Sequence, residues 1–557
     1  MLRSLSVLCV LAGAIPAQQS SDVAMGLFPF LVGNMDGRTA EVTNACATRG
    51  IETLYVSVFR ATGASQGDLW ISDPSGTWNP AWGPVRPGGA GIELRSLIAA
   101  AHARDMRVVA VLKCFDDTVQ PTDANHRAYL LSVIDWLLGR YESDGSPTYD
   151  LDGLALDYVR FVGSGTGNNA SLVTNFVADV KRHIGALSLH AYLIANRYTF
   201  DGPVYDGNFA SYASVRSSLA SQFGQDWEQM AQWVDVLMPM CYTADGSIYS
   251  TYARHQAYVR QAASYCRTAC NNVGHPTRRV CPVVRTYTDT AETTTVQTID
   301  ASITGALQGG ANGYQAFRYG TMQAAWWPVM QQYAAPGCNF PIPVASTSVD
   351  HLSLGVDPSA SRDQDQAANT LDVAFDWNSD GVLDTAFAPL APGAGLATDP
   401  SAKVVGIAVR DAQGHVSATR RRIVATAPLG LAQSSISANQ PVNLGIDLHV
   451  GAAGAGHGYV ILASLSGGTP GASYGGIHVP LNLDAFTEAL FSIANSPVLP
   501  GAIGVLDASG DAHASFVVPA GLLDPLRFRV VNWCAVGATP SGQPAFASNP
   551  SACLILP

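Results

Sequence analysis

The sequence predicts an α/β protein, a (β/α)8 TIM barrel followed by two small all-β, sandwich-like domains. Between residue 23 and about residue 335, short apolar runs alternate with amphipathic stretches in eight successive pairs. The apolar runs are nearly continuous, as is typical of a parallel sheet buried on both faces. After this region, short alternating runs are separated by Gly, Asp and Pro turns, and helix signals are few.

The eight candidate strands are short segments rich in Val, Leu, Ile and aromatic residues. They are GLFPFLVG (from Gly26), IETLYVSVFR (Ile51), MRVVAVLKCF (Met106), LDGLALDYVRF (Leu151), SLHAYLIANR (Ser188), VDVLMPMCYT (Val234), RRVCPVVRTYTD (Arg278) and GANGYQAFRYG (Gly310). Helical stretches such as IELRSLIAAAHARD repeat apolar residues every three or four positions, so each can cover a sheet. No glycine-rich phosphate loop follows the first strand, which favours a closed barrel over an open dinucleotide-binding sheet.

A chain of 557 residues is too long for one hydrophobic core. We predict a signal peptide at 1–17, the barrel at 22–336, a β-sandwich at 345–428 and an all-β module at 429–557, with the barrel ending at the Pro- and Gly-rich segment AAPGCNFPIPV. The charged fraction is 13% and the net charge is −12, which disfavours nucleic acid or an anionic membrane surface as a partner.

The first residues predict export. Arg3 precedes an apolar run from Leu5 to Ile15, and small residues follow before an expected cleavage site near Ala17. The run is too short to span a bilayer, and no later segment is long enough. We therefore expect a secreted or extracytoplasmic protein, in the periplasm or at the cell surface, without a membrane span.

Ten cysteines in an exported chain favour some disulfide pairing. Cys534 and Cys553 flank the final strands and are candidates for one bridge. Cys266, Cys270 and Cys281 cluster in sequence, and because no fourth ligand lies nearby, a disulfide or buried thiols are favoured over zinc.

Candidate site residues follow the predicted strands, because the active sites of parallel barrels form at the carboxyl ends of the strands. The set is polar, aromatic and mixed in charge, which suits the hydroxyl groups and ring faces of sugars. Its substrate-binding candidates are Lys113, Asp116, Tyr158, Arg160, Asn196, Tyr242, Arg285, Tyr287, Arg318 and Tyr319.

Asp157 is the most informative residue. In YDLDGLALDYVRF, strand alternation places Asp157 on the same side as Ala155, so the carboxyl group is expected beside the barrel axis. Arg160 and Lys113 are the cations expected to keep it ionised, as a nucleophile or electrostatic stabiliser requires. The alternative is a structural Asp–Arg ion pair that fixes the loop.

The segment YDLDGLALDYVRF resembles the fourth strand of glycosyl-hydrolase-like family ten, whose pattern is DG, three mainly hydrophobic positions, then DY-x-R. It is also similar to the fourth strand of the wider alpha-amylase-like group, whose nucleophile would fall on Asp157. VDVLMPMCY and GANGYQAFRYG resemble the sixth and eighth strands of the same family. Over residues 25 to 335 the resemblance implies hydrolysis of glycosidic bonds in a carbohydrate polymer or oligosaccharide.

The chain departs from the alpha-amylase-like pattern because no Glu closes the fifth strand, which ends in Asn196 and Arg197. Asp245, after the sixth strand, is the predicted second catalytic carboxylate, with Asp116, Asp117, Asp289 and Glu292 as further candidates. A separation of about 5 to 5.5 Å between the two carboxyl groups would indicate a retaining mechanism, and about 6.5 to 9.5 Å an inverting one.

Trp70, Trp78 and Trp82 follow the second strand and predict either a sugar-stacking wall or the packing of that loop. Two functional alternatives remain: a non-catalytic carbohydrate-binding barrel, which the missing Glu favours, and a metal-dependent hydrolase. The latter is disfavoured because no His-x-His closes the first strand, and no catalytic metal is expected.

The segment DWNSDGVLDT, followed by VVGIAVRDAQGHVS, resembles a polycystic-kidney-disease type of β-sandwich. Within it, the candidate ligands of a structural calcium loop are Asp376, Asn378, Asp380 and Asp384. Position twelve of that loop is Phe387 instead of a bidentate Glu, so an Asx-rich turn is favoured over calcium. The last module carries no catalytic motif, and a spacer or attachment role is its simplest interpretation.

Overall fold

The fold is taken from a computed structural model that describes most of residues 23–556. The ranges outside the described residues are 1–22, 75–77, 117, 140–146, 163–168, 186, 196–199, 201–208, 243–251, 291–292, 335–340, 342, 344–345, 351–352, 364–366, 378–382, 391–395, 398–402, 413–415, 418–419, 425–428, 434, 469–470, 549 and 557. The predicted signal peptide therefore lies outside the described residues.

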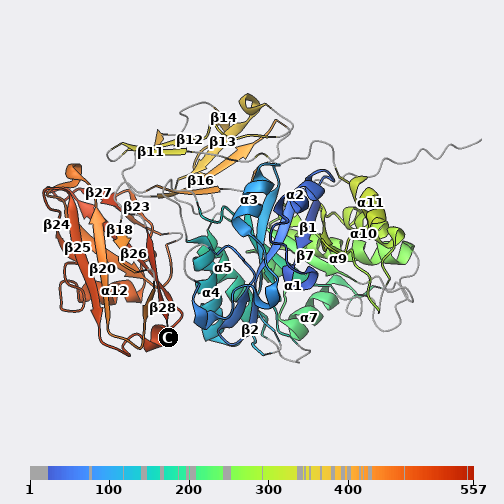
Figure 1. Ribbon diagram of the computed structural model, residues 1–557, viewed down its shortest axis with the longest axis horizontal. Helices are drawn as coiled ribbons and strands as arrows, with labels where there is room; N and C mark the ends of the chain where they lie inside the picture. Colours follow the sequence, from blue (N-terminus) through green and yellow to red (C-terminus); the bar gives the residue numbers. More distant parts are fainter. Residues whose placement is uncertain are drawn as a thin grey trace, which may run out of the picture.

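The predicted fold class is confirmed: the chain forms a closed barrel of eight parallel strand positions within the described residues, followed by separate antiparallel sheets (Figure 1). The barrel closes because β1 pairs with both β2 and β10. Around the ring the strands are β1 (Val23–Leu27), β2 (Thr53–Gly63), β4 (Arg107–Lys113), β5 (Gly153–Asp157), β6 (Ser188–Ile194), β7 (Val236–Cys241), β8 (Arg279–Val280) with β9 (Val283–Arg285), and β10 (Tyr314–Phe317). A short strand, β3 (Gln66–Leu69), folds back on the end of β2.

Helices surround the barrel and cover its outer face (Figure 1). They are α2 (Thr39–Ala47), α3 (Leu94–His102), α4 (Ala124–Leu138), α5 (Ala170–Ile184), α7 (Tyr212–Phe223), α8 (Trp227–Ala231), α9 (Tyr252–Asn272), α10 (Val296–Gln308) and α11 (Trp327–Gln331). The short α1 (Pro29–Val32) instead lies at the mouth of the barrel. Several begin at the expected capping residues: the side chain of Asp123 accepts from the His126 amide at 3.0 Å, and that of Asn169 from the Ser171 amide at 2.9 Å.

The first strand differs from its prediction. The apolar run from Gly26 was expected to form one strand, but the strand ends at Leu27 and Pro29 begins α1. Proline favours the first turn of a helix, because the amide it lacks has no intrahelical acceptor there. The apolar run is therefore divided between a barrel strand and a helical turn at the mouth of the barrel.

The barrel interior is filled by side chains from alternate strand positions. Tyr55, Val111, Ala155, Tyr192 and Met238 belong to this cluster and are at most 2% exposed. At Gly26 a Cβ atom would lie 2.8 Å from the Gln315 amide nitrogen, so only glycine leaves room for that side chain. The interior is thus a packed core up to the carboxyl ends of the strands.

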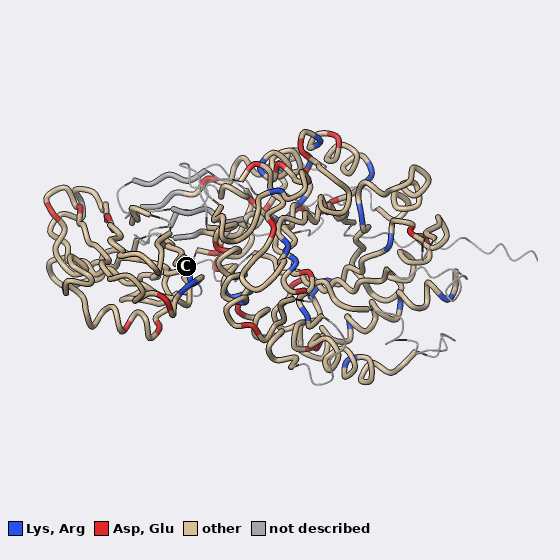
Figure 2. The backbone as a smooth tube through the Cα atoms, turned by 60° about the horizontal axis from the view of Figure 1, so that its bottom comes forward, with Lys and Arg blue, Asp and Glu red and all other residues tan. Residues whose placement is uncertain are grey.

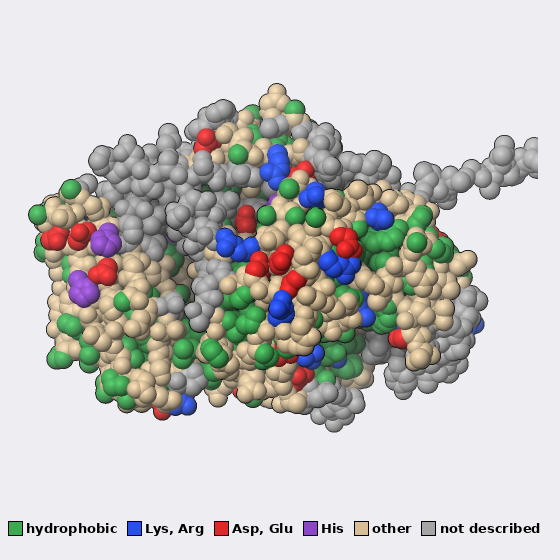
Figure 3. All heavy atoms as spheres, in the orientation of Figure 1, with side chains coloured by type: hydrophobic (Ala, Val, Ile, Leu, Met, Phe, Trp, Pro, Cys, Tyr) green, Lys and Arg blue, Asp and Glu red, His purple; other side chains and the backbone are tan. Residues whose placement is uncertain are grey.

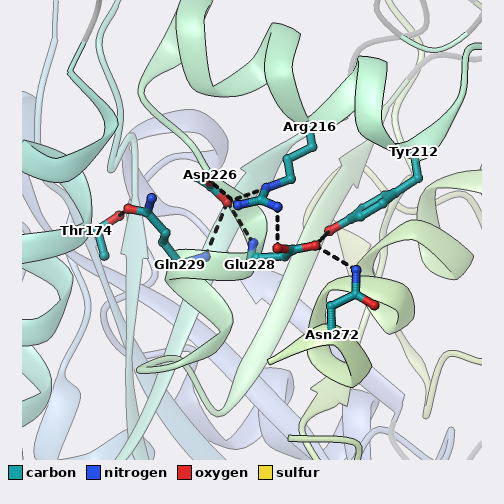
Figure 4. Close-up of polar contacts among 7 residues, drawn as sticks. All are labelled: Thr174, Tyr212, Arg216, Asp226, Glu228, Gln229 and Asn272. Carbon is teal, nitrogen blue, oxygen red and sulfur yellow. Dashed lines mark hydrogen bonds and ion pairs between the residues drawn. The ribbon is translucent and has the colours of Figure 1, made fainter. Parts of the chain in front are cut away.

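A polar network ties α7, α8 and the end of α9 together outside the barrel (Figure 4). Arg216 on α7 forms two 2.9 Å hydrogen bonds with Asp226, the N-cap of α8, and also contacts Glu228. Tyr212 and Asn272 donate to the same Glu228 carboxylate at 3.1 and 2.7 Å. The network fixes Asp226, the residue directly after Gln225, at the start of α8.

The second domain is a pair of small antiparallel sheets, with strand orders β11-β12-β15 and β14-β13-β16-β17. Val356, Val373, Phe375, Val405 and Ile407 form its small core. Its strands are β11 (Ser346–Asp350), β12 (Ser353–Asp357), β13 (Asp372–Asp376), β14 (Ala388–Pro389), β15 (Leu396–Ala397), β16 (Lys403–Arg410) and β17 (Arg420–Val424). Arg362 joins it to the barrel through an ion pair with Asp105 at 3.3 Å.

The C-terminal module is a β-sandwich with one helix, and a core that includes Leu444, Ile446 and Trp533. It packs on the barrel near α4, where Phe528 meets the ring of Tyr129 with centroids 6.1 Å apart. Its elements are β18 (Leu429–Leu431), β19 (Ser435–Ser437), β20 (Val442–His449), β21 (Gly458–Ser464), β22 (Ala472–Tyr474), β23 (Ile477–Val479), α12 (Ala485–Ser492), β24 (Ile503–Val505), β25 (Asp511–Val518), β26 (Val530–Ala538), β27 (Pro544–Ala547) and β28 (Ser551–Leu556).

Paired His and Asp side chains lie on the solvent face of this module, where Figure 3 shows them as purple and red spheres. His449 contacts Asp511 at 3.0 Å and His513 contacts Asp447 at 2.7 Å, each across the β20–β25 register. These pairs alternate with the inward apolar residues of β20, as strand periodicity requires.

The expectation of disulfides is wrong for the described residues: all eight described cysteines are free and buried. Cys534 and Cys553 cannot pair because they lie on opposite faces of one sheet. Cys553 is opposite Val531 and belongs to the sandwich core, whereas Cys534 packs against Leu481 and Ala547 on the other side. Cys281 points into the barrel, away from Cys266 and Cys270 on α9.

None of the helices in the described part of the chain combines the length and apolar character needed to cross a bilayer.

Of the predicted calcium ligands, Asn378 and Asp380 lie outside the described residues. Asp376 is fully buried, and Asp384 accepts a hydrogen bond from the Trp377 amide at 2.6 Å.

Candidate active site

A pocket of about 420 Å³ opens at the carboxyl ends of the barrel strands. Its walls combine aromatic and apolar side chains with three cations and one carboxylate. The lining residues are Phe28, Phe30, Leu31, Arg60, Lys113, Asp157, Tyr158, Arg160, Ile194, Ala195, Met240, Tyr242 and Phe317. They come from six strands, β2, β4, β5, β6, β7 and β10, and from the segments after β1, β5, β6 and β7, so only the closed barrel brings them together.

Three charged residues stand in one row across neighbouring strands. Lys113 of β4 is the direct register partner of Asp157 of β5 and of Arg60 of β2. The register of β2 shifts between Ser57 and Phe59, and this β-bulge places Arg60 beside Lys113. The row lies at the level where the strands end and the pocket begins.

Asp157 points inward from the end of β5, as the alternation with Ala155 predicted. Its Oδ1 accepts a hydrogen bond from the Tyr158 amide at 2.8 Å. Burial raises the pKa of Asp157 to about 6, against the lowering effects of this hydrogen bond and of the charges on Arg160 and Lys113. The sequence predicted that these cations keep the carboxyl group ionised, but desolvation outweighs them.

Tyr158 is held in an uncommon backbone conformation next to Asp157, with φ at 51°. Its ring contacts two cations: Lys113 Nζ lies 4.7 Å and the Arg160 guanidinium carbon 4.3 Å from the ring centroid. Cations are attracted to aromatic ring faces, so the ring positions both side chains near Asp157.

Aromatic rings form another part of the pocket wall. Phe317 of β10 lies 4.8 Å from Phe28 and 4.9 Å from Tyr242, measured between ring centroids. Phe30, in the α1 turn, continues this wall to Trp70, whose ring is 5.2 Å away. The guanidinium carbon of Arg60 lies 5.4 Å from the centroids of both the Phe30 and the Trp70 rings, so the pocket combines apolar ring surfaces with charged groups.

Gln225, which precedes α8, connects two strands of the site from behind. Its amide nitrogen donates to the carbonyl oxygens of Val159 at 3.3 Å and Tyr192 at 3.1 Å, and its oxygen accepts from the Ile194 amide at 2.7 Å. Gln225 is fully buried. It therefore fixes the segment after Asp157 to the end of β6.

Other predicted residues lie near the pocket without lining it. The Asp116 carboxylate accepts from Thr118 at 2.7 Å and lies 3.9 Å from Lys113 Nζ, so it mainly closes its own loop. Arg285 is buried, pairs with Asp289 at 3.0 Å, and its guanidinium carbon lies 3.8 Å from the centroid of the Tyr287 ring.

Arg318 and Tyr319 directly follow β10, and their side chains have different partners. The Arg318 guanidinium lies 5.4 Å from the Tyr287 ring, and one of its nitrogens donates to the Leu31 carbonyl oxygen at 3.4 Å, at the rim of the pocket. Tyr319 instead turns toward α2, where its hydroxyl group donates to Glu41 at 3.1 Å.

Several predicted residues lie outside the described part of the chain: Asn196, Asp245, Asp117 and Glu292. Asp245, the predicted second carboxylate, thus has no described position. Within the described residues no group of three or more His, Cys, Asp or Glu side chains could hold a metal ion.

The tryptophans after β2 pack the loop. Trp70, Trp78 and Trp82 are at most 6% exposed. Trp78 lies 4.8 Å from Trp82 and 5.0 Å from Trp136 between ring centroids, on the side of the barrel that faces the C-terminal module. Of the two roles predicted for these residues, packing is the one found.

Sequence reasoning missed Phe28, Phe30, Met240 and Phe317 as lining residues, and it missed Gln225. Arg60 closes the second predicted strand but was not among the predicted substrate-binding residues. The alternation Val236, Met238, Met240, Tyr242 in β7 could have identified Met240, because these residues share one face. The end of the second predicted strand is a local signal for Arg60, but the bulge that aligns Arg60 with Lys113 is not. The contacts of Gln225 join residues far apart in sequence and leave no local signal.

The sequence matches no protein-family model and no curated protein. Solved structures that match include the spore cortex-lytic enzyme SleL of Bacillus cereus, at 12% identity over 57% of this chain and 75% of that chain, with a TM-score of 0.38. The C-terminal domain of a putative chitinase from Desulfitobacterium hafniense DCB-2 matches at 13% identity, 57% and 100% coverage and a TM-score of 0.38. The endo-beta-1,4-mannanase of Thermotoga petrophila matches at 8% identity, 97% and 98% coverage and a TM-score of 0.39.

At these sequence identities and TM-scores, similarity to the solved structures does not indicate the activity of this chain. The resemblances of its segments to glycosyl-hydrolase-like family ten and to the polycystic-kidney-disease type of sandwich therefore stay predictions.

Proposed function

We propose that this protein is an exported glycoside hydrolase that cleaves glycosidic bonds of a polysaccharide or oligosaccharide in the pocket above Asp157. The observation that carries the proposal is the Asp157 carboxyl group, which lines this pocket with a pKa raised to about 6. A carboxyl group tuned in this way is suited to proton transfer near neutral pH.

The raised pKa favours Asp157 as the proton donor. Below about pH 6 the group retains its proton and can pass it to the oxygen of the departing sugar. The nucleophile or stabiliser role predicted from the sequence needs the ionised form, which prevails above that pH. In this proposal Asp245 supplies the second carboxylate, and Lys113 and Arg160 position Asp157 through their charges and through the Tyr158 ring.

The walls support a saccharide as substrate. Tyr242 and Phe317 present ring faces of the kind on which sugar rings stack, while Lys113, Arg160 and Arg60 carry donors for hydroxyl groups. A volume of about 420 Å³ lies within the roughly 300 to 1,000 Å³ typical of pockets for small ligands.

The test is the release of reducing ends from a panel of polysaccharides by the mature protein between pH 4 and pH 8. Asp157→Asn should abolish release, whereas Asp179→Asn, at an exposed position on α5 that pairs with Arg182, should leave it unchanged. As a proton donor, Asp157 gives an activity that falls above about pH 6. An activity that rises through the same range would assign Asp157 as the ionised nucleophile.

One observation favours a second candidate, a non-catalytic carbohydrate-binding barrel. Among the described residues that line the pocket, Asp157 is the only carboxylate, and cleavage by the usual glycosidase mechanisms needs two. Retention of the wild type and of Asp157→Asn on one immobilised glycan, without reducing-end release by either, would establish the binding barrel.

A further inference from the structure

The lining of the pocket is cationic in a chain that is acidic overall. Arg60, Lys113 and Arg160 face a single carboxylate, Asp157, among the described lining residues. The whole chain has a net charge of −12, and Figure 2 shows basic and acidic residues interspersed over the barrel instead of gathered on separate faces. Three cations in one pocket are therefore a local feature of the site.

The three cations differ in how they are compensated. Arg60 pairs with Asp68 at 2.9 Å, and Lys113 lies 3.9 Å from Asp116. The contacts of Arg160 within the described residues are aromatic: its guanidinium carbon lies 4.3 Å from the Tyr158 centroid and 5.9 Å from that of Phe223. Its Nε is buried without a hydrogen-bond partner among the described residues.

Arg318, at the opposite rim, is likewise held by aromatic rings and has a buried Nε atom. Its guanidinium lies 5.4 Å and 5.5 Å from the rings of Tyr287 and Phe317, and its Nε has no hydrogen-bond partner in the described structure. Two guanidinium groups held by rings, and paired with no carboxylate in the described residues, thus stand on two sides of one pocket. Arginine binds carboxylate and sulfate oxygens through paired hydrogen bonds, which a neutral hydroxyl group cannot replace.

We propose that the pocket takes an anionic saccharide, a glycan whose units carry carboxylate or sulfate groups, and that Arg160 binds the anionic group beside Tyr158. This inference rests on the proposed function, since it names the substrate class of the same site. The sugar ring would stack on the wall formed by Phe317 and Tyr242, while its charged substituent faces the row of Lys113 and Arg160. Arg318 would contact the neighbouring unit at the rim.

The test compares matched pairs of oligosaccharides by isothermal titration calorimetry with the full chain, using the Asp157→Asn variant so that nothing is hydrolysed. One pair is an oligouronate and its carboxyl-reduced counterpart, and the other is a sulfated oligosaccharide and its desulfated form. We expect at least one charged member to bind about tenfold or more tightly than its neutral partner, with an affinity that falls as salt rises. The pair that responds identifies carboxylate or sulfate as the recognised group.

Arg160→Gln should weaken binding of the charged member about tenfold or more and leave the neutral member unchanged. Arg160→Lys retains the charge and should recover part of the affinity. Arg182→Gln is the matched control, because Arg182 also lies over an aromatic ring, 5.0 Å from Trp233, but far from this pocket on α5. It should change neither affinity.

Equal affinity for charged and neutral members, no binding of either charged glycan, or an equal loss of both members in Arg160→Gln would overturn the inference. Its failure is distinguishable from failure of the proposed function. Release of reducing ends from neutral glycans alone would support the proposed hydrolase function and contradict the anionic substrate class. Tight binding of a charged glycan, without reducing-end release by the wild type, would support the anionic ligand and contradict the proposed hydrolase function.

Discussion

Replacing Asp157 by Asn should raise the free energy of unfolding at neutral pH. In acid the variant and the wild type should be equally stable. The folded state raises the pKa of this carboxyl group from 3.8 to about 6. The folded protein therefore binds the proton more tightly than the unfolded chain does, and ionisation opposes folding. Stability is highest below about pH 4 as far as this group is concerned, and its contribution is lost as pH rises through about 6.

The size of the effect follows from the shift. A difference of about two pKa units corresponds to about 3 kcal/mol, at about 1.4 kcal/mol per unit. Because the carboxyl group faces an open pocket, solvent screens part of this penalty, and we expect about 1 to 2 kcal/mol at pH 7.5. An amide carries no charge at any pH, so Asp157→Asn should gain this amount at pH 7.5 and nothing at pH 4.

The measurement is the free energy of unfolding from urea denaturation at both pH values, with the barrel transition followed by tryptophan fluorescence. Asp116→Asn is the matched control, since hydrogen bonds from Thr118 and Val119 and the charge on Lys113 lower the pKa of Asp116. That variant should be destabilised at pH 7.5, and its loss should shrink as pH falls. Equal effects of Asp157→Asn at the two pH values would refute the assignment of a raised pKa.

Three further predictions concern the support of the site and the state of the cysteines. Gln225→Ala should cost about 3 kcal/mol of unfolding free energy, because it leaves buried amide and carbonyl groups without partners; Gln323→Ala, at an exposed position, should change it by less than about 0.5 kcal/mol. Arg216→Ala should cost about 2 kcal/mol by removing the bonds to Asp226 and Glu228, and Arg216→Lys should restore only part of it, since lysine lacks the paired donors; equal stability of the two variants in urea denaturation would contradict this. A thiol reagent should label the eight described cysteines only after unfolding, as peptide mapping of the labelled sites would show; rapid labelling of any of these eight in the native protein would show that the packing described is wrong.

The barrel could be predicted from the sequence because its signals are local. Apolar runs of strand length recur between amphipathic stretches, and the period of two that joins Ala155 to Asp157 decides which way a side chain points. The same rule explains the inward position of Lys113 and Tyr242. Where local chemistry competes, the prediction fails, as at Pro29, which divides the first apolar run between strand and helix.

The remaining properties of the site depend on the tertiary structure. The bulge in β2 aligns Arg60 with Lys113, and Gln225 contacts β6 and the segment after β5; both join residues that are far apart in sequence. The burial that raises the pKa of Asp157 is produced by many residues that are distant in sequence. The nearby cations alone suggested that this pKa would be lowered. The sequence by itself therefore determined which strands form and where Asp157 points, since these follow from the periodicity of a few adjacent residues. The closed barrel decided what surrounds Asp157 and whether it keeps its proton, because desolvation and register arise only when the strands are packed together.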